Sequence, residues 1–192
     1  MKLRESGMPE EVYWESLFNP DLILDRLEIG GRLHGVVELG CGYGTFSLPV
    51  ARRISGRLRT FDIDPAMVAR TIERAEAERI CNIACAPRDV FLNGFGIPPD
   101  SQDACLLFNI LHAEEPLRLL NEAARVIRPG GFVHVIHWRH DPATPRGPSL
   151  QIRPHPEQVV AWADQTKRLV LSGSPLDLPP WHYGISLFKR SV

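Results

Sequence analysis

The chain has 192 residues, of which 44% are hydrophobic and 23% charged, and its formal net charge is −1. This is the length and composition of one folded domain with its own core, and the near-zero net charge gives no strong signal for nucleic-acid binding. The sequence has no apolar run of the roughly 18 residues that span a bilayer, and its first eleven residues lack the apolar core of a signal peptide, so no membrane span and a cytoplasmic location are expected.

Helices are predicted near the N-terminus, and alternating strands and helices follow them. Residues 9–28 have a helical pattern that Asn19-Pro20 interrupts, so 1–30 is expected to form a helical cap on an α/β core made by 31–192, all within one domain. The alternation predicts a parallel sheet with helices on both faces. The predicted strands are 36–40, 58–62, 81–85, 103–109 and 131–137, and the predicted helices are 45–54, 65–79 and 115–128.

Two of these helices have clear boundary signals. Pro65 suits a first helical turn because its ring fixes a helical φ, and the carboxylate of Asp64 can cap that turn. The segment Pro129-Gly130-Gly131 is expected to end the helix predicted at 115–128 and to turn the chain.

The C-terminal part departs from the strand–helix alternation. Residues 138–156 contain five prolines and predict an ordered loop, and a helix is predicted at 156–166. Strands are predicted at 168–172 and about 183–189. The residues between these two strands have no helical pattern, so the strands are expected to be antiparallel.

The strongest functional signal is the segment Val36-Val-Glu-Leu-Gly-Cys-Gly-Tyr-Gly44. Glycines after a strand allow a tight turn and a close approach of the backbone to a ligand. The spacing is Gly-x-Gly-x-Gly, whereas dinucleotide sites have Gly-x-Gly-x-x-Gly. Glu38 would repel a pyrophosphate but attract an ammonium or sulfonium group, and S-adenosylmethionine carries both.

Four segments, in order and approximate spacing, resemble the class I S-adenosylmethionine-dependent methyltransferases. They are ValValGluLeuGlyCysGlyTyrGly at 36–44, PheAspIleAspProAlaMet at 61–67, AspAlaCysLeuLeuPheAsnIleLeuHis at 103–112 and LeuAsnGluAlaAlaArgValIleArgProGlyGly at 120–131. The resemblance implies a doubly wound, mostly parallel, seven-stranded Rossmann-like sheet whose last strand is antiparallel. It also implies S-adenosylmethionine as cofactor. The PheAsnIleLeuHis segment is most similar to small-molecule and quinone-type methyltransferases.

The resemblance further implies which residues bind the cofactor. The carboxylate of Asp62 can accept both ribose hydroxyl hydrogens, and it is preferred to Asp64 for this role. Asp89 would receive the adenine amino group, although Arg88 could instead pair with it. The expected cofactor-binding set is Glu38, Gly40, Cys41, Gly42, Gly44, Asp62, Ile63, Asp89, Val90 and Asn109.

Further polar and aromatic residues are candidates for catalysis and substrate binding. His112 follows the fourth strand and could act as a general base, or it could cap or pack a helix. The fifth strand and the antiparallel last strand should bring aromatic and histidine side chains to the same rim, although such residues also anchor loops to cores. The substrate candidates are Trp14, His137, His182 and Tyr183.

The cysteines predict no metal site, because none has the CxxC spacing. Cys81 and Cys85 could form a thiol pair on one face of a strand, as in methyltransferases that act on arsenite, or they could be small buried apolar residues. Histidine and carboxylate spacings give no metal signal either.

These observations predict an S-adenosylmethionine-dependent methyltransferase with a small-molecule acceptor. One alternative is a non-catalytic S-adenosylmethionine-binding or scaffold protein, which would bind the cofactor without transferring the methyl group. A nicotinamide-dependent oxidoreductase is a second alternative, against which Glu38 and the missing third dinucleotide glycine argue. The sequence does not identify the acceptor, the methylated atom or the oligomeric state.

Overall fold

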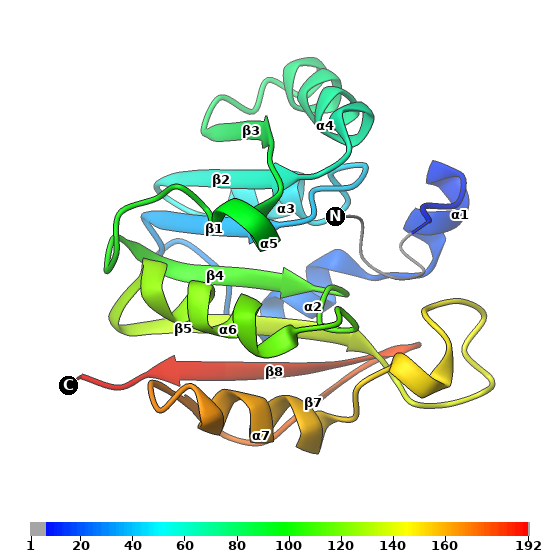
Figure 1. Ribbon diagram of the computed structural model, residues 1–192. Coiled ribbons are helices and arrows are strands. Elements are labelled where there is room, and N and C mark those ends of the chain that lie inside the picture. The colour runs from blue at the N-terminus through cyan, green and yellow to red at the C-terminus, as the bar shows by residue number, and fades with distance from the viewer. Residues whose placement is uncertain (1–6, 192) are drawn as a thin grey trace.

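Eight strands form one mixed sheet in the computed structural model, which describes residues 7–191 (Figure 1). Residues 1–6, on which the signal-peptide prediction partly rests, and residue 192 lie outside this described part. The order across the sheet is β3-β2-β1-β4-β5-β8-β6, and β7 also pairs with β8. The strands are β1 (Gly35–Leu39), β2 (Arg57–Asp62), β3 (Ile83–Pro87), β4 (Gln102–Phe108), β5 (Ile127–Trp138), β6 (Leu169–Leu171), β7 (Leu176–Leu178) and β8 (His182–Lys189).

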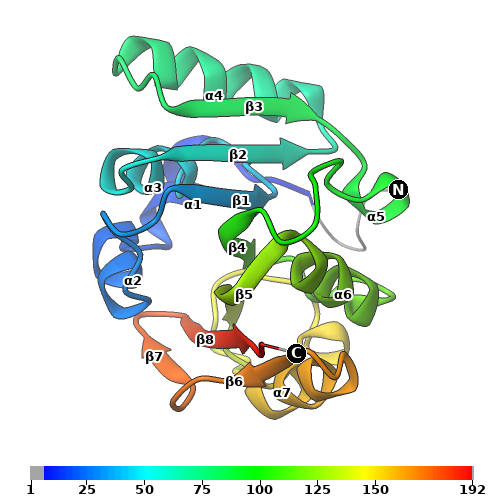
Figure 2. The ribbon, with the colours of Figure 1, turned by 90° about the vertical axis from the view of Figure 1, so that its left-hand side faces the viewer.

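Helices cover both faces of this sheet, so the molecule has three layers. Figure 2 shows α2 and α3 on one side of the sheet and α6 and α7 on the other. No helix within residues 7–191 has the length and apolar character needed to cross a membrane. The helices are α1 (Glu11–Ser16), α2 (Pro20–Arg26), α3 (Ser47–Arg53), α4 (Pro65–Ala77), α5 (Val90–Asn93), α6 (Pro116–Val126) and α7 (Pro156–Gln165), with a 3₁₀ turn at Leu150–Ile152.

The central strands are buried on both faces, as their apolar sequences predict. Successive residues of a strand point to opposite faces. Val36 and Leu106 pack in the core beneath α2 and α3, whereas Val37 and Leu107 pack in the core beneath α6. All four side chains are fully buried. The sheet therefore has two hydrophobic cores, one on each face.

Strand directions follow the prediction. β1 pairs in parallel with β2 and β4, and β8 runs antiparallel to both β5 and β6. Because β1 to β5 point the same way, their carboxyl ends meet at one edge of the sheet, where α1 and the loop after β5 also lie (Figure 1). This edge is where ligands bind in open parallel sheets.

Some elements differ from those predicted. The three-residue strand β7 lies within residues 173–182, for which neither a helix nor a strand was predicted, and its Leu178 is fully buried and pairs with His182. The sheet therefore has one more strand than the predicted seven. Helix α5 and the 3₁₀ turn were not predicted, because elements of four and three residues have no periodicity to detect.

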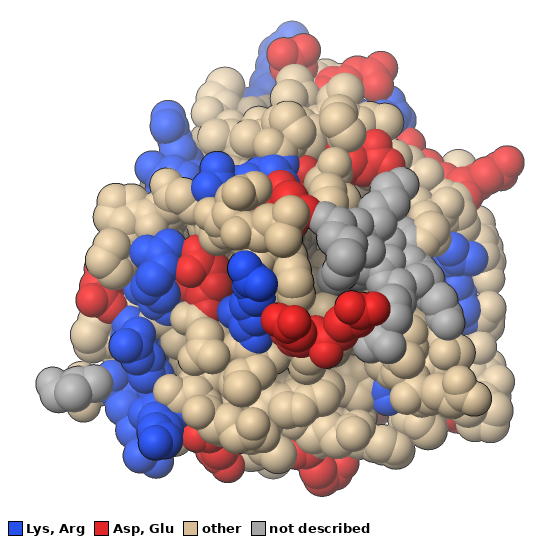
Figure 3. Space-filling view, in the orientation of Figure 1, with Lys and Arg blue, Asp and Glu red and all other residues tan. Residues whose placement is uncertain are grey.

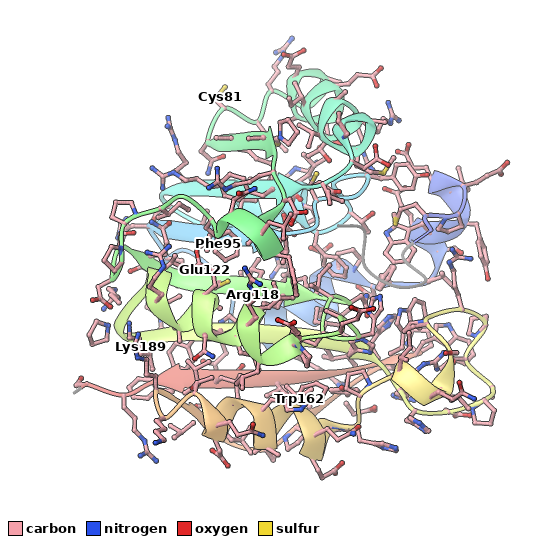
Figure 4. The ribbon with its side chains drawn as sticks, viewed as in Figure 1. Cys81, Phe95, Arg118, Glu122, Trp162 and Lys189 are labelled. Atoms are coloured by element: carbon pink, nitrogen blue, oxygen red, sulfur yellow. The ribbon has the colours of Figure 1, made fainter. Side chains whose placement is uncertain are left out.

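The prediction for the cysteines is wrong in one respect. Strand β3 begins at Ile83, so Cys81 lies in the preceding loop and is exposed, whereas Cys85 is partly buried within β3. Figure 4 shows Cys81 at the end of β3 opposite to the carboxyl ends of the strands. Neither residue is in a disulfide. Cys81 is therefore not a buried apolar residue.

We expect Leu106→Ala to lower the free energy of unfolding by about 2–5 kcal/mol, because it leaves a cavity in the centre of the sheet. Leu92→Ala on α5 is the matched control. The Leu92 side chain is 60% exposed, so this substitution is expected to lower the free energy of unfolding by less than about 0.5 kcal/mol. Urea unfolding followed by circular dichroism measures both values, and equal losses would contradict the assignment of Leu106 to the core.

Candidate functional site

A cavity of about 770 Å³ opens at the carboxyl ends of the parallel strands. Its walls come from the glycine turn after β1, the end of β2, the start of α5, the end of β4, the loop after β5 and the N-terminal segment. Nine of the ten predicted cofactor residues line it, and Gly44 is the exception. They are Glu38, Gly40, Cys41, Gly42, Asp62, Ile63, Asp89, Val90 and Asn109.

The carboxylate of Asp62 connects two of these walls. Its Oδ2 accepts a hydrogen bond from the Gly42 N–H at 3.0 Å, and its Oδ1 accepts one from the Asp64 N–H at 2.9 Å. Each carboxylate oxygen can accept a second hydrogen bond. Asp62 thus fixes the glycine turn against β2 and still has acceptor capacity for a ligand.

Asp64 has the structural role that its position before Pro65 predicts. Its Oδ1 accepts a hydrogen bond from the Ala66 N–H at 3.0 Å, so it caps α4. Both carboxylates line the cavity, and the Asp62 carboxylate also accepts a hydrogen bond from the glycine turn.

The turn after β1 requires glycine at the three alternate positions. Gly40, Gly42 and Gly44 have φ values of +86°, +51° and +83°, a region that other residues rarely adopt. A Cβ on Gly40 would come within 3.0 Å of Ile110, and one on Gly44 within 3.2 Å of Leu48. Gly44 therefore packs the turn onto α3 and does not line the cavity.

Glu38 is almost fully buried at the base of the cavity. The Ser47 hydroxyl at the start of α3 donates a hydrogen bond of 2.5 Å to its Oε2. Burial raises the pKa of Glu38 to about 7, against the opposing effect of this hydrogen bond. The charge of this carboxyl group therefore changes near neutral pH.

The wall after β3 is held by backbone contacts. Asp89 caps α5, because its Oδ1 accepts a hydrogen bond from the Leu92 N–H at 3.0 Å. The guanidinium of Arg88 donates to the carbonyls of Asn93 and Gly94. These contacts of Arg88 fix the chain around α5 through its backbone.

The end of β4 supplies two polar side chains to the cavity. Asn109 has a φ of +56° and donates its N–H to the Ile136 carbonyl at 2.8 Å, while its Oδ1 is buried without a hydrogen-bond partner among the described residues. His112 is 6% exposed, lines the cavity, and packs edge-on against His137 with ring centroids 5.5 Å apart.

Three of the four predicted substrate residues do not line the cavity. The register brings His137 opposite Tyr183 and Trp138 opposite His182, so the ends of the two strands meet at the same rim, as predicted. However, both histidines are fully buried, and the Tyr183 hydroxyl donates to the Pro154 carbonyl at 2.8 Å. Burial lowers the pKa of His182 to about 3, so it is neutral. These three residues pack the core beneath the cavity, in contrast to the prediction.

Other residues take the place of those three. Trp14, which was predicted, lines the cavity together with Phe46, Phe108 and Trp138. Arg146 lines it as well, from the loop after β5. The alternation of side chains along a strand could have indicated Trp138, since it must face opposite to His137.

The N-terminal helix is held over the cavity by ion pairs with α4. Glu11 pairs with Arg70 at 2.8 Å and with Arg74 at 3.2 Å, and Glu15 pairs with Arg74 at 2.5 Å. The Tyr43 hydroxyl of the glycine turn donates to the Pro9 carbonyl at 2.7 Å. Residues 7–191 contain no cluster of three histidine, cysteine or acidic side chains arranged to hold a metal.

The sequence profile of a family described as a methyltransferase domain matches residues 36–131, half of the chain. An uncharacterized 37.1 kDa protein of transposon TN4556 from Streptomyces fradiae is 27% identical over 77% of the chain. The chain spans less than half the length of that curated relative, 45%.

Solved structures share the fold. An S-adenosylmethionine-dependent methyltransferase from Aquifex aeolicus has a TM-score of 0.80 at 19% identity, over 93% of each chain. A geranyl diphosphate C-methyltransferase from Streptomyces coelicolor has a TM-score of 0.71 at 15% identity, over 88% of this chain and 79% of that one. At these identities the likeness establishes the fold alone.

The raised pKa of Glu38 makes stability depend on pH. The folded chain keeps this proton up to about pH 7, whereas the unfolded chain releases it near pH 4.5. Folding therefore becomes less favourable as pH rises between these values. We expect Glu38→Gln, which removes the titration, to be more stable than the wild type above pH 7 by up to about 3 kcal/mol and similar to it near pH 4.5.

Urea unfolding at several pH values from 4.5 to 8 measures this difference. Glu76→Gln on the exposed side of α4 is the control for the loss of a surface carboxylate, and it should change the free energy of unfolding by less than about 0.5 kcal/mol. A Glu38→Gln difference that does not grow with pH would contradict the assigned burial effect.

Proposed function

The chain belongs to the methyltransferase domain family, and from this membership we propose that it transfers the methyl group of S-adenosylmethionine to a small-molecule acceptor. The observation that carries the proposal is the arrangement of the glycine turn, Asp62 and Asp89 around one cavity. Its volume of about 770 Å³ lies in the range of small-molecule sites and leaves room for a second molecule beside an adenosyl ligand.

The residues of the cavity fit this cofactor. The backbone of the glycine turn can approach the methionine part closely, and the remaining lone pairs of Asp62 suit the ribose hydroxyls. Asp89 and the Val90 backbone suit the adenine edge. The buried Oδ1 of Asn109 gains a partner if a donor group enters the cavity.

The charge of the cavity wall also fits. Glu38, Asp62, Asp64 and Asp89 all line it, so a ligand with ammonium and sulfonium groups is favoured over one with a pyrophosphate. When bound, S-adenosylmethionine supplies an electrophilic methyl group on a charged sulfur. The protein then has to place the acceptor and exclude water, which supplies much of the catalytic effect.

The chain's own residues can perform these two tasks. Trp14, Phe46, Phe108 and Trp138 form an apolar wall that keeps water away from the acceptor. His112 lies on the cavity wall, where it can remove a proton from an acceptor hydroxyl or amine.

A small-molecule acceptor is favoured over a nucleic acid. The apolar wall lies inside the cavity, and the net charge of the chain is −1. On the face shown in Figure 3, acidic and basic residues are both present between uncharged ones. The similar enzyme from Streptomyces coelicolor holds geranyl diphosphate, a small molecule, together with S-adenosylhomocysteine.

We expect Asp62→Asn to weaken S-adenosylhomocysteine binding at least about tenfold, since it removes a charged acceptor of hydrogen bonds. Asp64→Asn should keep affinity within about threefold, because asparagine also caps helices. Titration calorimetry measures both, with NAD as a ligand expected not to bind. Equal losses in the two variants would contradict the distinct role of Asp62, and NAD binding would favour an oxidoreductase.

We expect His112→Gln to lower kcat about 10²-fold or more without changing S-adenosylhomocysteine affinity, since general base catalysis contributes effects of this size. The assay measures S-adenosylhomocysteine release with small phenols, amines and carboxylic acids as acceptors. An unchanged kcat would exclude His112 as the base. If no acceptor in a broad screen leads to S-adenosylhomocysteine release although the cofactor binds tightly, a non-catalytic binding protein would be favoured.

A further inference from the structure

The cavity has two halves of different chemistry. Its four carboxylates come from the ends of β1 and β2 and from the segments after β2 and β3. The other half is lined by Trp14, Phe46, Phe108, Trp138 and Arg146. Among the described lining residues, none from this second half is acidic.

We propose that the methyl acceptor is a planar, apolar molecule with an anionic group, and that Arg146 binds this group and so determines acceptor specificity. The inference rests on the proposed function, because it assigns the second half of the cavity to the acceptor.

The contacts of Arg146 leave it able to bind an anion. Its side chain is partly buried, and one of its nitrogens donates to the Gly7 carbonyl. Within residues 7–191 no carboxylate forms an ion pair with it. A guanidinium has five N–H donors in a planar fork that matches a carboxylate or a phosphate. The other basic lining residue, Arg88, donates to two carbonyls and is adjacent to Asp89.

A second guanidinium fixes the loop that carries Arg146. Arg153 is 6% exposed and donates to the carbonyls of Arg139 at 2.8 Å, Pro148 at 2.8 Å and Arg146 at 3.4 Å. The carboxylate of Asp141, the acid of this loop, accepts from the Ala143 N–H. Arg153 therefore holds the loop through backbone carbonyls, and the Asp141 carboxylate interacts electrostatically with the same guanidinium.

Gly147 brings the same loop against the aromatic wall. Its φ is +118°, and a Cβ there would lie 2.8 Å from Trp138 Cγ and 3.0 Å from Arg153 Nη2. The backbone beside Arg146 thus touches both the aromatic wall and the buried guanidinium. A loop fixed in this way loses little conformational entropy when a ligand binds.

The aromatic wall is built for a flat apolar molecule. Phe46 and Phe108 pack edge-on with centroids 5.1 Å apart, and Trp14 and Trp138 do so at 6.3 Å. Ring faces and edges favour planar partners. The carboxylates opposite repel an anion, so the anionic group is held at Arg146 and the remainder of the molecule extends towards the cofactor half.

The test uses 2-naphthoate and its neutral analogue 2-naphthamide as probes, titrated into protein with and without saturating S-adenosylhomocysteine. We expect the wild type to bind naphthoate at least tenfold more tightly than naphthamide. Arg146→Gln should reduce naphthoate affinity to the level of naphthamide and leave naphthamide unchanged. Arg146→Lys, which keeps the charge, should retain part of the preference.

Arg57→Gln is the control for net charge, since Arg57 is exposed at the amino end of β2, opposite to the cavity. It should leave both probe affinities as in the wild type. The affinity for S-adenosylhomocysteine should be the same in all variants, and circular dichroism confirms that each is folded.

The outcomes separate this inference from the proposed function. Three results would overturn the inference while S-adenosylhomocysteine still binds. They are equal affinities of the wild type for the two probes, an undiminished preference for naphthoate in Arg146→Gln, and binding of neither probe. If the folded wild type does not bind S-adenosylhomocysteine, the proposed function fails, and the acceptor assignment fails with it.

Discussion

The site depends on one carboxylate that joins two strands. β1 and β2 pair in parallel, with Leu39 opposite Phe61, so the turn after β1 ends beside Asp62. The Gly42 N–H then donates to Asp62, and the Asp64 N–H donates to its other oxygen. This arrangement fixes the left-handed glycine turn together with the hydrogen bonds from the Gly40 N–H to the Phe61 carbonyl and from the Thr71 hydroxyl to the Gly42 carbonyl. The position of Asp62 thus fixes the cavity wall and the chain before α4. It also leaves lone pairs of the carboxylate available to accept hydrogen bonds from a ribose.

The cavity has acidic residues on one side and a basic residue on the other, and a ligand of opposite charge would stabilise each side. Acidic groups lie close together on one side, and burial raises the pKa of Glu38 to about 7. Arg146 lies on the other side, and the buried Arg153 holds its loop by donating to carbonyls and a threonine hydroxyl. In the proposed complex, a cationic cofactor and an anionic acceptor would compensate these two regions separately. The same separation of charge orients both molecules, so binding and specificity have a common physical origin.

Much of the fold and of the cavity wall around the glycine turn could be predicted from local sequence. Apolar strand patterns, the glycine spacing and the Asp64-Pro65 cap each depend on neighbouring residues, and the structure has them. In the apolar half, Trp14 was predicted, whereas Trp138 and Arg146 were not. Whether His137 or Trp138 faces the cavity depends on the packing of N-terminal residues on the sheet, and the place of Arg146 depends on a loop that Arg153 holds through several backbone carbonyls. Such long-range contacts leave no periodic signal.

A crystal structure of the protein with S-adenosylhomocysteine tests the central claim most directly. The account predicts that the ribose hydroxyls donate to the Asp62 carboxylate, that the amino-acid part lies along Gly40 and Gly42, and that the apolar half with Trp138 and Arg146 stays open beside the sulfur. A ligand bound away from Asp62, or one that fills the apolar half, would contradict both the cofactor site and the acceptor site assigned here.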